Sequence, residues 1–241
     1  PELRHHPWRN GAALLAVMLG VALAFSVQLI NQSALSEFSA AVRAVNGAPD
    51  FELRAQRDGF DEALYTRVAL HPQVAIASPV IEIDTFAVDD RPEAKDVRVA
   101  LKIVGLDALV AAPLSPALAP RPADGADRLA LLAPDAIFLN PLARQRLAGE
   151  TLRVQTGRGS AVLRVQGTIA APGSALAVMD IAGVQRHFGW TGRLGRIDVR
   201  LRPGADRERV LRELALPPEV RAAAPDEAAQ RVSNVSRAYR V

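Results

Sequence analysis

The polar side chains that could carry out catalysis or bind a metal are widely separated in this sequence. The four histidines are His5, His6, His71 and His187, and no carboxylate or further histidine stands at the spacing that a metal site needs. His5 and His6 are adjacent near the N-terminus, whereas His71 and His187 come at the ends of predicted helices. We therefore expect surface or helix-capping roles for all four, and we predict no metal site.

Other motifs with chemical potential also lack the required pattern. Gly157-Arg158-Gly159 falls between two predicted strands and lacks the G-x-x-x-x-G-K-S/T pattern of a phosphate-binding loop. Ser174 lacks the strand-to-helix elbow of a serine nucleophile. The pairs Asp89-Asp90 and Asp226-Glu227 are typical of a solvated turn and of the first turn of a helix. With no cysteine either, disulfides and thiolate chemistry are excluded. We predict no catalytic residues, no cofactor and no enzymatic activity, which argues against a membrane-anchored hydrolase.

The charge balance argues against a nucleic-acid partner. The sequence holds 29 Lys and Arg residues against 26 Asp and Glu residues, and the basic residues are dispersed. Nucleic-acid binding favours clustered basic residues interleaved with aromatic residues, yet aromatic residues make up only 5% of this chain. The residues after Ile30 are enough for one large domain or two small ones.

An uncharged, mostly apolar run extends from Gly11 to Ile30. It has the length that an α-helix needs to cross a lipid bilayer, so we predict a transmembrane helix over residues 11–30, surrounded by membrane lipid. Arg4 and Arg9 precede the run, which predicts a cytoplasmic N-terminus (residues 1–10) and a periplasmic or extracellular location after about residue 31. The residues taken to mark the span are Gly11, Leu15, Leu19, Leu23 and Ile30.

This run has two other interpretations. A buried helix of a soluble core is disfavoured, because nothing downstream is apolar enough to surround a helix that is apolar on every face. A cleaved signal peptide is the second alternative, since Ala22-Leu23-Ala24 has the A-x-A form of a cleavage site. Apolar residues continue past that site through Phe25 and Leu29, which favours a retained anchor.

The helix is expected to continue as an amphipathic stalk over residues 31–47. Its apolar residues recur at a spacing of three or four, and Asn46-Gly47-Ala48-Pro49 is a helix-stop signal. A separate surface helix remains the alternative. The apolar positions assigned to the coupling stalk are Leu35, Phe38, Val42 and Val45.

Beyond the stalk, the pattern predicts an α+β fold. Alternating apolar residues predict strands at 80–84, 97–103, 152–154, 163–165 and 197–201, and short apolar segments predict further strands at 51–55, 136–139, 176–179 and 220–223. Helices are predicted from a stripe through Phe60, Leu64, Val68 and Ala69, over 142–147 after Asn140-Pro141, over 181–188 between Asp180 and Gly189, and after Asp206. Residues 129–133 fit either a helix or a strand, and a proline-rich break covers 111–127.

The last segments repeat the pattern of the first, which predicts two lobes. Residues 48–110 and 193–224 are expected to form a first lobe of mixed α/β character, and residues 111–192 an inserted, mostly β lobe. Residues 225–241 are expected to form a polar return stalk that leads toward a second transmembrane helix.

The order of these segments resembles the N-terminal part of a bacterial permease of the MacB/FtsX-like ABC transporter family. Each motif is short, and their order over nearly the whole chain carries the resemblance. The matching stretches are His6-Pro7-Trp8-Arg9-Asn10, residues 74–79, Val104-Gly105-Leu106-Asp107, Leu139-Asn140-Pro141, Gly149-Glu150-Thr151-Leu152, residues 178–181, residues 196–201 and Pro203-Gly204-Ala205-Asp206.

The resemblance implies a bacterial inner-membrane permease segment that is not itself an enzyme. An ABC ATPase on a separate cytoplasmic subunit would drive it, and the permease would form a dimer with the same or a related chain. The first and second transmembrane helices would then move the periplasmic domains, which handle a substrate or partner protein outside the membrane. Lipoprotein, lipid, peptide and small toxic molecules are all compatible substrates. No later spans follow, so a fragment of a permease is expected.

A rival interpretation is a singly anchored or secreted envelope binding or scaffold domain without an ATPase partner. It predicts a chain that ends naturally near Val241. About twenty apolar residues encoded directly downstream would favour the permease instead.

Overall fold

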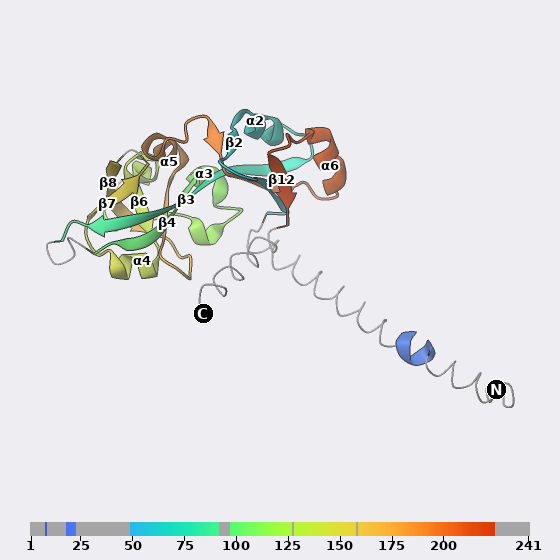
Figure 1. Ribbon diagram of the computed structural model, residues 1–241, viewed down its shortest axis with the longest axis horizontal. Coiled ribbons are helices and arrows are strands. Elements are labelled where there is room, and N and C mark those ends of the chain that lie inside the picture. Colours follow the sequence, from blue (N-terminus) through green and yellow to red (C-terminus); the bar gives the residue numbers. More distant parts are fainter. Residues whose placement is uncertain are drawn as a thin grey trace. The chain divides into compact units, whose positions relative to one another are not determined.

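The computed structural model describes residues 8, 18–22, 49–91, 97–126, 128–157 and 159–224 (Figure 1). The chain divides into two compact units, Pro1–Val45 and Asn46–Val241. In the first unit, residues 18–22 are helical, and the Leu19 side chain is 53% exposed. No helix within the described residues has the length and apolar character needed to cross a bilayer.

The second unit is built from short helices and a large sheet. In chain order its elements are β1 (Phe51–Ala55), β2 (Phe60–Asp61), α2 (Ala63–Ala69), β3 (Val74–Asp89), β4 (Val99–Leu106), α3 (Ala108–Ala111), the 3-10 helix η3 (Pro116–Leu118), β5 (Arg121–Pro122), the 3-10 helix η4 (Arg128–Leu132), β6 (Ala136–Leu139), α4 (Pro141–Arg146), β7 (Thr151–Thr156), β8 (Gly159–Thr168), β9 (Leu176–Asp180), α5 (Ile181–Phe188), β10 (Arg193–Leu194), β11 (Arg196–Leu201), α6 (Arg207–Leu214) and β12 (Val220–Ala223).

The first lobe is an antiparallel sheet that packs two helices on one face. Strands β12, β1, β11 and the first half of β3 are neighbours in that order. Successive side chains of a strand point to opposite faces, so one face of β1 and β11 is apolar and packs on α2 and α6 in a single buried core. The residues of this contact are Phe51, Leu53, Ile197 and Val199 from the strands and Leu64, Val68, Val210 and Leu214 from the helices.

The second lobe is a closed barrel. β3 pairs with β4, β4 with β9, β9 with β6, β6 with β8, β8 with β7, and β7 pairs again with β3. The pairs β4–β9 and β6–β8 are parallel and the others are antiparallel. Closure of the ring pairs the strand edges that an open sheet would expose. Alternate residues of these strands, such as Leu101, Leu152 and Leu163, fill the interior.

Strand β3 connects the two lobes. Its 16 residues span about 50 Å at the rise of an extended strand. The first half pairs with β11 in the first lobe, and from Val80 onward β3 pairs with β4 in the barrel. One cluster of buried apolar side chains runs through both lobes, so the two lobes share a core.

One outer side of the barrel is covered by the segment that contains α3, η3 and η4. Val104 and Leu106 of β4, Phe138 of β6 and Val178 of β9 are buried in a second apolar cluster, with Leu118 and Leu131 of that segment packed against it.

The helix signals of the sequence are confirmed. The side chains of Asn140, Asp180 and Asp206 each accept a hydrogen bond from a backbone N–H group in the first turn of α4, α5 and α6. Gly189 ends α5 with φ of 73°, a left-handed conformation that glycine adopts without steric cost. The strands predicted at 51–55, 136–139 and 220–223 are also confirmed.

Several predicted boundaries need correction. Phe60 was expected in the stripe of a helix, but it pairs with Leu194 in the short β2–β10 ladder, and α2 begins only at Ala63. The predicted strand at 80–84 is the middle of the longer β3. The ambiguous segment 129–133 lies largely in the 3-10 helix η4.

The predicted first lobe (48–110) contains strands that the pairing assigns to the barrel. The second half of β3 pairs with β7, and β4 pairs with β9. The border between the lobes therefore runs through β3.

Candidate functional site

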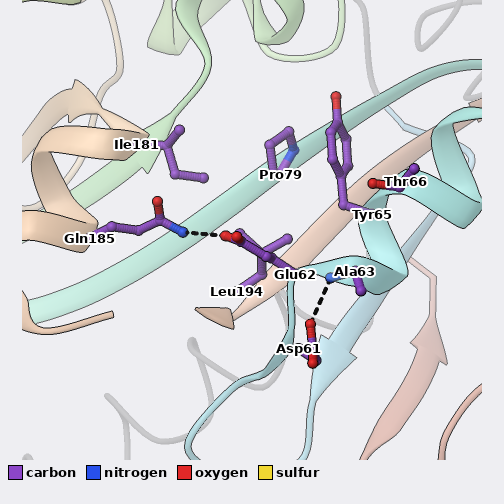
Figure 2. A pocket seen from close by; sticks show the side chains of 9 residues that line it. All are labelled: Asp61, Glu62, Ala63, Tyr65, Thr66, Pro79, Ile181, Gln185 and Leu194. Carbon is purple, nitrogen blue, oxygen red and sulfur yellow. Dashed lines mark hydrogen bonds between the residues drawn. The ribbon is translucent and has the colours of Figure 1, made fainter. Parts of the chain in front are cut away.

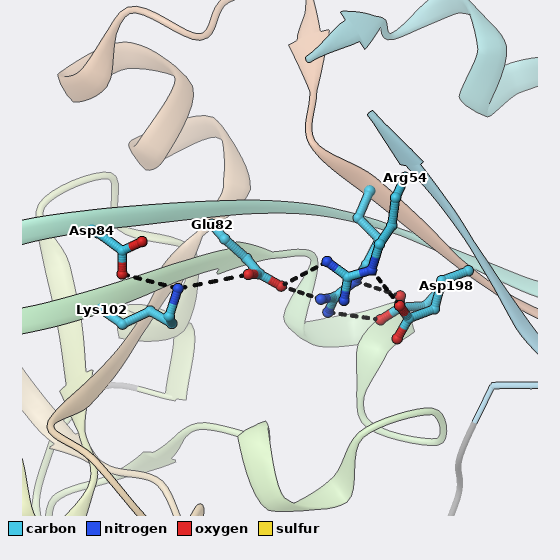
Figure 3. Close-up of polar contacts among 7 residues, drawn as sticks. Arg54, Glu82, Asp84, Lys102 and Asp198 are labelled. Atoms are coloured by element: carbon cyan, nitrogen blue, oxygen red, sulfur yellow. Dashed lines mark hydrogen bonds and ion pairs between the residues drawn. The ribbon is translucent and has the colours of Figure 1, made fainter. Parts of the chain in front are cut away.

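A row of charged side chains runs from β1 and β11 of the first-lobe sheet to β3 and β4 of the barrel (Figure 3). On β1 and β11 these residues alternate with the apolar residues that face α2 and α6, and on β3 and β4 they alternate with apolar residues of the barrel interior. The members of this charged row are Glu52 and Arg54 of β1, Arg196 and Asp198 of β11, Glu82 and Asp84 of β3, and Lys102 of β4.

Glu82 lies at the centre of the charged row. Its carboxylate pairs with the Arg196 guanidinium and lies 3.7 Å from both Arg54 Nη1 and Lys102 Nζ. Lys102 Nζ also contacts an Asp84 oxygen at 2.9 Å, which extends the row along the barrel. The row therefore connects strands of both lobes through one carboxylate (Figure 3).

The row is most deeply buried at the pair of Arg196 and Asp198, whose Nε and Oδ1 atoms lie 2.6 Å apart. Burial opposes the charge of Arg196, but the carboxylates of Asp198 and Glu82 outweigh it and raise the pKa of the guanidinium. Burial raises the pKa of Asp198, while Arg196 opposes that change. This pair depends on mutual compensation, since an unpaired buried charge is strongly destabilising.

The charged row is nearly balanced and internally paired. Four carboxylates and three cations take part, and each has an opposite charge within 3.7 Å. The opposite charges of these side chains link β1, β11, β3 and β4 on this face.

A hollow of about 450 Å³ lies where the first lobe meets α5 of the second lobe (Figure 2). Its apolar wall consists of Pro79, Ile181 and Leu194. The remaining lining residues, which come from β2, α2 and α5, are Asp61, Glu62, Ala63, Tyr65, Thr66 and Gln185.

A single side-chain hydrogen bond spans this inter-lobe hollow. Gln185 Nε2 of α5 donates to Glu62 Oε2, next to α2, at 2.9 Å (Figure 2). Asp61 Oδ1 accepts the backbone N–H of Ala63 at 2.8 Å. Burial and the nearby Asp107 carboxylate raise the pKa of Tyr65. The Glu62–Gln185 contact is exposed to solvent.

The residues considered for chemistry have structural partners. His71 Nε2 lies 3.1 Å from Glu213 Oε2, and His187 Nε2 lies 3.1 Å from the Pro134 carbonyl oxygen. The carbonyl of Ser174 accepts a hydrogen bond from Asn140 Nδ2. Within the described ranges, no three His, Asp or Glu side chains gather in a way that could hold a metal ion.

The expectation that Asp89 lies in a solvated turn is wrong. Asp89 is buried at the end of β3, where Arg91 and the backbone N–H of Ala148 donate to its carboxylate. Burial opposes its charge, but the hydrogen bonds from Arg91 outweigh that effect and lower the pKa of Asp89.

Most residues assigned to the membrane span and the stalk lie outside the described residues. Of the span, Leu19 is described as helical and exposed. The assignments that lie outside are Gly11, Leu15, Leu23, Ile30, Leu35, Phe38, Val42, Val45 and the return stalk at 225–241. These assignments stay predictions.

Sequence reasoning missed the charged row and the inter-lobe hollow. Arg196, Asp198 and Arg200 alternate with apolar residues, which is the pattern of a strand with one solvated face. Residues of opposite charge that stand two apart on a strand lie on the same face, so this spacing could have predicted ion pairs between them.

Comparisons with known proteins agree on the fold. The family of the MacB-like periplasmic core domain matches residues 11–215. The periplasmic region of MacB from Actinobacillus actinomycetemcomitans superposes with a TM-score of 0.55 at 10% identity, covering 76% of this chain and 92% of that one. The extracellular domain of the noncanonic ABC-type transporter YknZ from Gram-positive bacteria gives 0.53 at 13% identity, covering 72% and 98%. None of the curated proteins matches the sequence.

Proposed function

The chain belongs to the family of MacB-like periplasmic core domains, and on that premise we propose that it transmits ATP-driven movement within an ABC-type transporter. In this proposal residues 11–30 cross the inner membrane, an ABC ATPase works in the cytoplasm, and the periplasmic domain changes position with each ATPase cycle. A pair of permease chains would present two such domains to a substrate or partner outside the membrane.

The pairing of β1 with β12 is the observation that carries this proposal. Glu52 lies opposite Ala223 in an antiparallel ladder, so the chain enters the domain before β1 and leaves it after β12 at the same end of the sheet. Paired residues of antiparallel strands lie about 5 Å apart. Two segments joined to neighbouring strands act at the same end of the domain, so together they can push or pull it.

The interior of the domain supports transmission over a long distance. A displacement at β1 passes through its hydrogen bonds to β11 and from β11 to β3. β3 then continues into the barrel, and the charged row ties the same strands on their polar face. Packed cores and paired strands deform little, so they move as a body.

A helix-breaking substitution in the predicted stalk tests the proposal. Proline removes a backbone hydrogen bond and kinks a helix, so Phe38→Pro should separate ATP hydrolysis from export in the transporter reconstituted with its ATPase. Hydrolysis should continue while export falls, and the melting temperature of the domain should stay unchanged. Phe38→Ala is the matched control, because it removes the same ring and retains a helix former. Export by Phe38→Pro at the level of Phe38→Ala would refute the proposal.

A further inference from the structure

An uncovered apolar strip lies on the outer face of the barrel, near the end of β3. Phe86 of β3 is 48% exposed and Val162 of β8 is 57% exposed. The register places Val88 beside Arg153 of β7, and Arg153 beside Val162. Side chains at paired positions point to the same face of a sheet, so apolar and cationic side chains alternate across three strands.

Two hollows lie side by side on this face. One, of about 420 Å³, is lined in part by Val88, Arg153 and Val162. The other, of about 290 Å³, is lined in part by Phe86, Arg98 and the same Val88 and Arg153. Each hollow is large enough for a side chain, and the shared wall would separate two neighbouring side chains of one occupant.

Two cations of this face lack an ion pair among the described residues, whereas the carboxylate of Asp89 has one. Within the described residues, neither Arg98 nor Arg153 forms an ion pair. Asp89 is held by Arg91, and Asp90 accepts the hydroxyl hydrogen bond of Thr151. Among the described residues at the two hollows, the cations Arg91, Arg98 and Arg153 outnumber the carboxylates Asp89 and Asp90, so the face carries a net positive charge beside its apolar side chains. An occupant with the complementary pattern would carry carboxylates around an apolar side chain.

We propose that this face, formed by Phe86, Val88, Arg98, Arg153 and Val162, docks a segment of another protein in which apolar side chains alternate with carboxylates. The other side of the barrel, formed by β4, β6 and β9, is covered by the α3–η4 segment of the same chain. The face at β3, β7 and β8 has no such cover among the described residues, which supports a docking role for it. Uncovered apolar side chains framed by polar ones are typical of interaction sites.

The lining of the hollows favours a peptide over an anionic membrane surface. Thr151, Gln155 and Ser160 contribute polar groups to the walls, and polar groups would remain unpaired against an acyl chain. Backbone and carboxylate groups of a peptide can pair with them. This inference goes beyond the proposed function, since it holds whether or not the stalk couples the domain to an ATPase.

The test uses the full chain in phosphatidylcholine nanodiscs and a fluorescein-labelled peptide that alternates aspartate with leucine. Fluorescence anisotropy should report binding with a Kd of about 10–100 µM, weakened by added salt. A peptide with lysine in place of aspartate should not bind. Arg153→Glu and Phe86→Ser should each raise the Kd by about tenfold or more.

Matched controls make the same changes on the other lobe. Arg67 and Leu70 are exposed near the end of α2, so Arg67→Glu and Leu70→Ser should leave the Kd within about twofold. Val162→Thr keeps the shape of the side chain and should also weaken binding. It keeps the test valid if one of the other variants does not fold.

Four outcomes would overturn the proposal. The first is that the acidic peptide does not bind at concentrations up to about 1 mM. The second is that the acidic and basic peptides bind equally well. The third is that the control variants Arg67→Glu and Leu70→Ser raise the Kd as much as Arg153→Glu and Phe86→Ser do. Sedimentation of the chain with phosphatidylglycerol vesicles that depends on Arg153 and Phe86, without peptide binding, would assign the face to a membrane and would likewise overturn it.

Discussion

Replacement of Asn140 by alanine should destabilise the barrel more than loss of any exposed helix cap. Asn140 is fully buried, and its side chain makes hydrogen bonds in two directions. Oδ1 accepts from the backbone N–H groups of Ala143 and Leu176 at 2.9 and 3.1 Å. Nδ2 donates to the carbonyl oxygens of Ala171 and Ser174 at 3.2 and 2.8 Å. One amide therefore caps α4 and fixes the segment that leads into β9.

The cost of Asn140→Ala follows from these four contacts. A hydrogen bond contributes about 1 kcal/mol net, and a buried group left without a partner costs more. The four contacts together predict a loss of about 4 kcal/mol in the free energy of unfolding. For a domain of this size, that corresponds to a fall of about 10 °C in the melting temperature.

The assay is urea unfolding of the full chain, followed by circular dichroism. Asp206→Ala is the comparison, because Asp206 caps α6 at the surface with two backbone contacts, and loss of an exposed cap costs about 1 kcal/mol. Asn140→Asp keeps the acceptor but directs a carboxylate at two carbonyl oxygens, so it should also destabilise. If Asn140→Ala cost no more than Asp206→Ala, the assignment of Asn140 as a buried connector would be refuted.

Three further predictions concern stability and are measured by thermal or urea unfolding. Arg196→Ala should cost about 3–5 kcal/mol because it leaves the buried Asp198 carboxylate without its ion pair. Arg209→Ala removes an exposed pair and should change the stability little; equal effects of the two substitutions would contradict the role of the charged row. Gly183→Ala should cost about 1–3 kcal/mol, since its new Cβ would lie 2.5 Å from a backbone oxygen, while Gly157→Ala has open space and is the control; a neutral Gly183→Ala would refute this close approach. Burial raises the pKa of Asp180, so the folded state binds the proton of this carboxyl more tightly than the unfolded state does. The wild type should therefore lose stability relative to Asp180→Asn as the pH rises from the unfolded pKa through the raised folded pKa. A difference in stability that stays constant across that range would contradict this prediction.

Local signals in the sequence predicted much of the fold because they act over a few residues. Asn140-Pro141 combines a capping side chain with a residue whose φ already suits a helix, and α4 begins there. The same applies to Asp180 and to the glycine at 189. Such signals depend little on the rest of the chain.

Features set by distant pairing could not be predicted in this way. Closure of the barrel depends on β7 pairing with β3 and on β4 pairing with β9, between segments far apart in the chain. Phe60 has the helical spacing to Leu64, yet the turn at Gly59, with φ of 89°, directs it into the ladder with β10. Tertiary pairing overrides local periodicity at that point.

The candidate sites also combine features that local sequence predicts with features that depend on distant pairing. The polar residues of β11 alternate as expected for a strand, but their burial follows from the neighbouring strands. The inter-lobe hollow needs Glu62 and Gln185, which are brought together only by the return of the chain from the barrel to the first lobe.

A distance measurement can detect whether the domain moves with the ATPase cycle. Residues 1–241 hold no cysteine, so Leu70→Cys, at a side chain that is 78% exposed, adds one spin-label site to this part of the chain once any cysteines elsewhere in the transporter are replaced by serine. In the whole transporter in nanodiscs, double electron–electron resonance between two copies should give a distance that shifts on addition of ATP and returns after hydrolysis. A distance that is the same without nucleotide, with ATP and after hydrolysis, while the ATPase is active, would contradict the account.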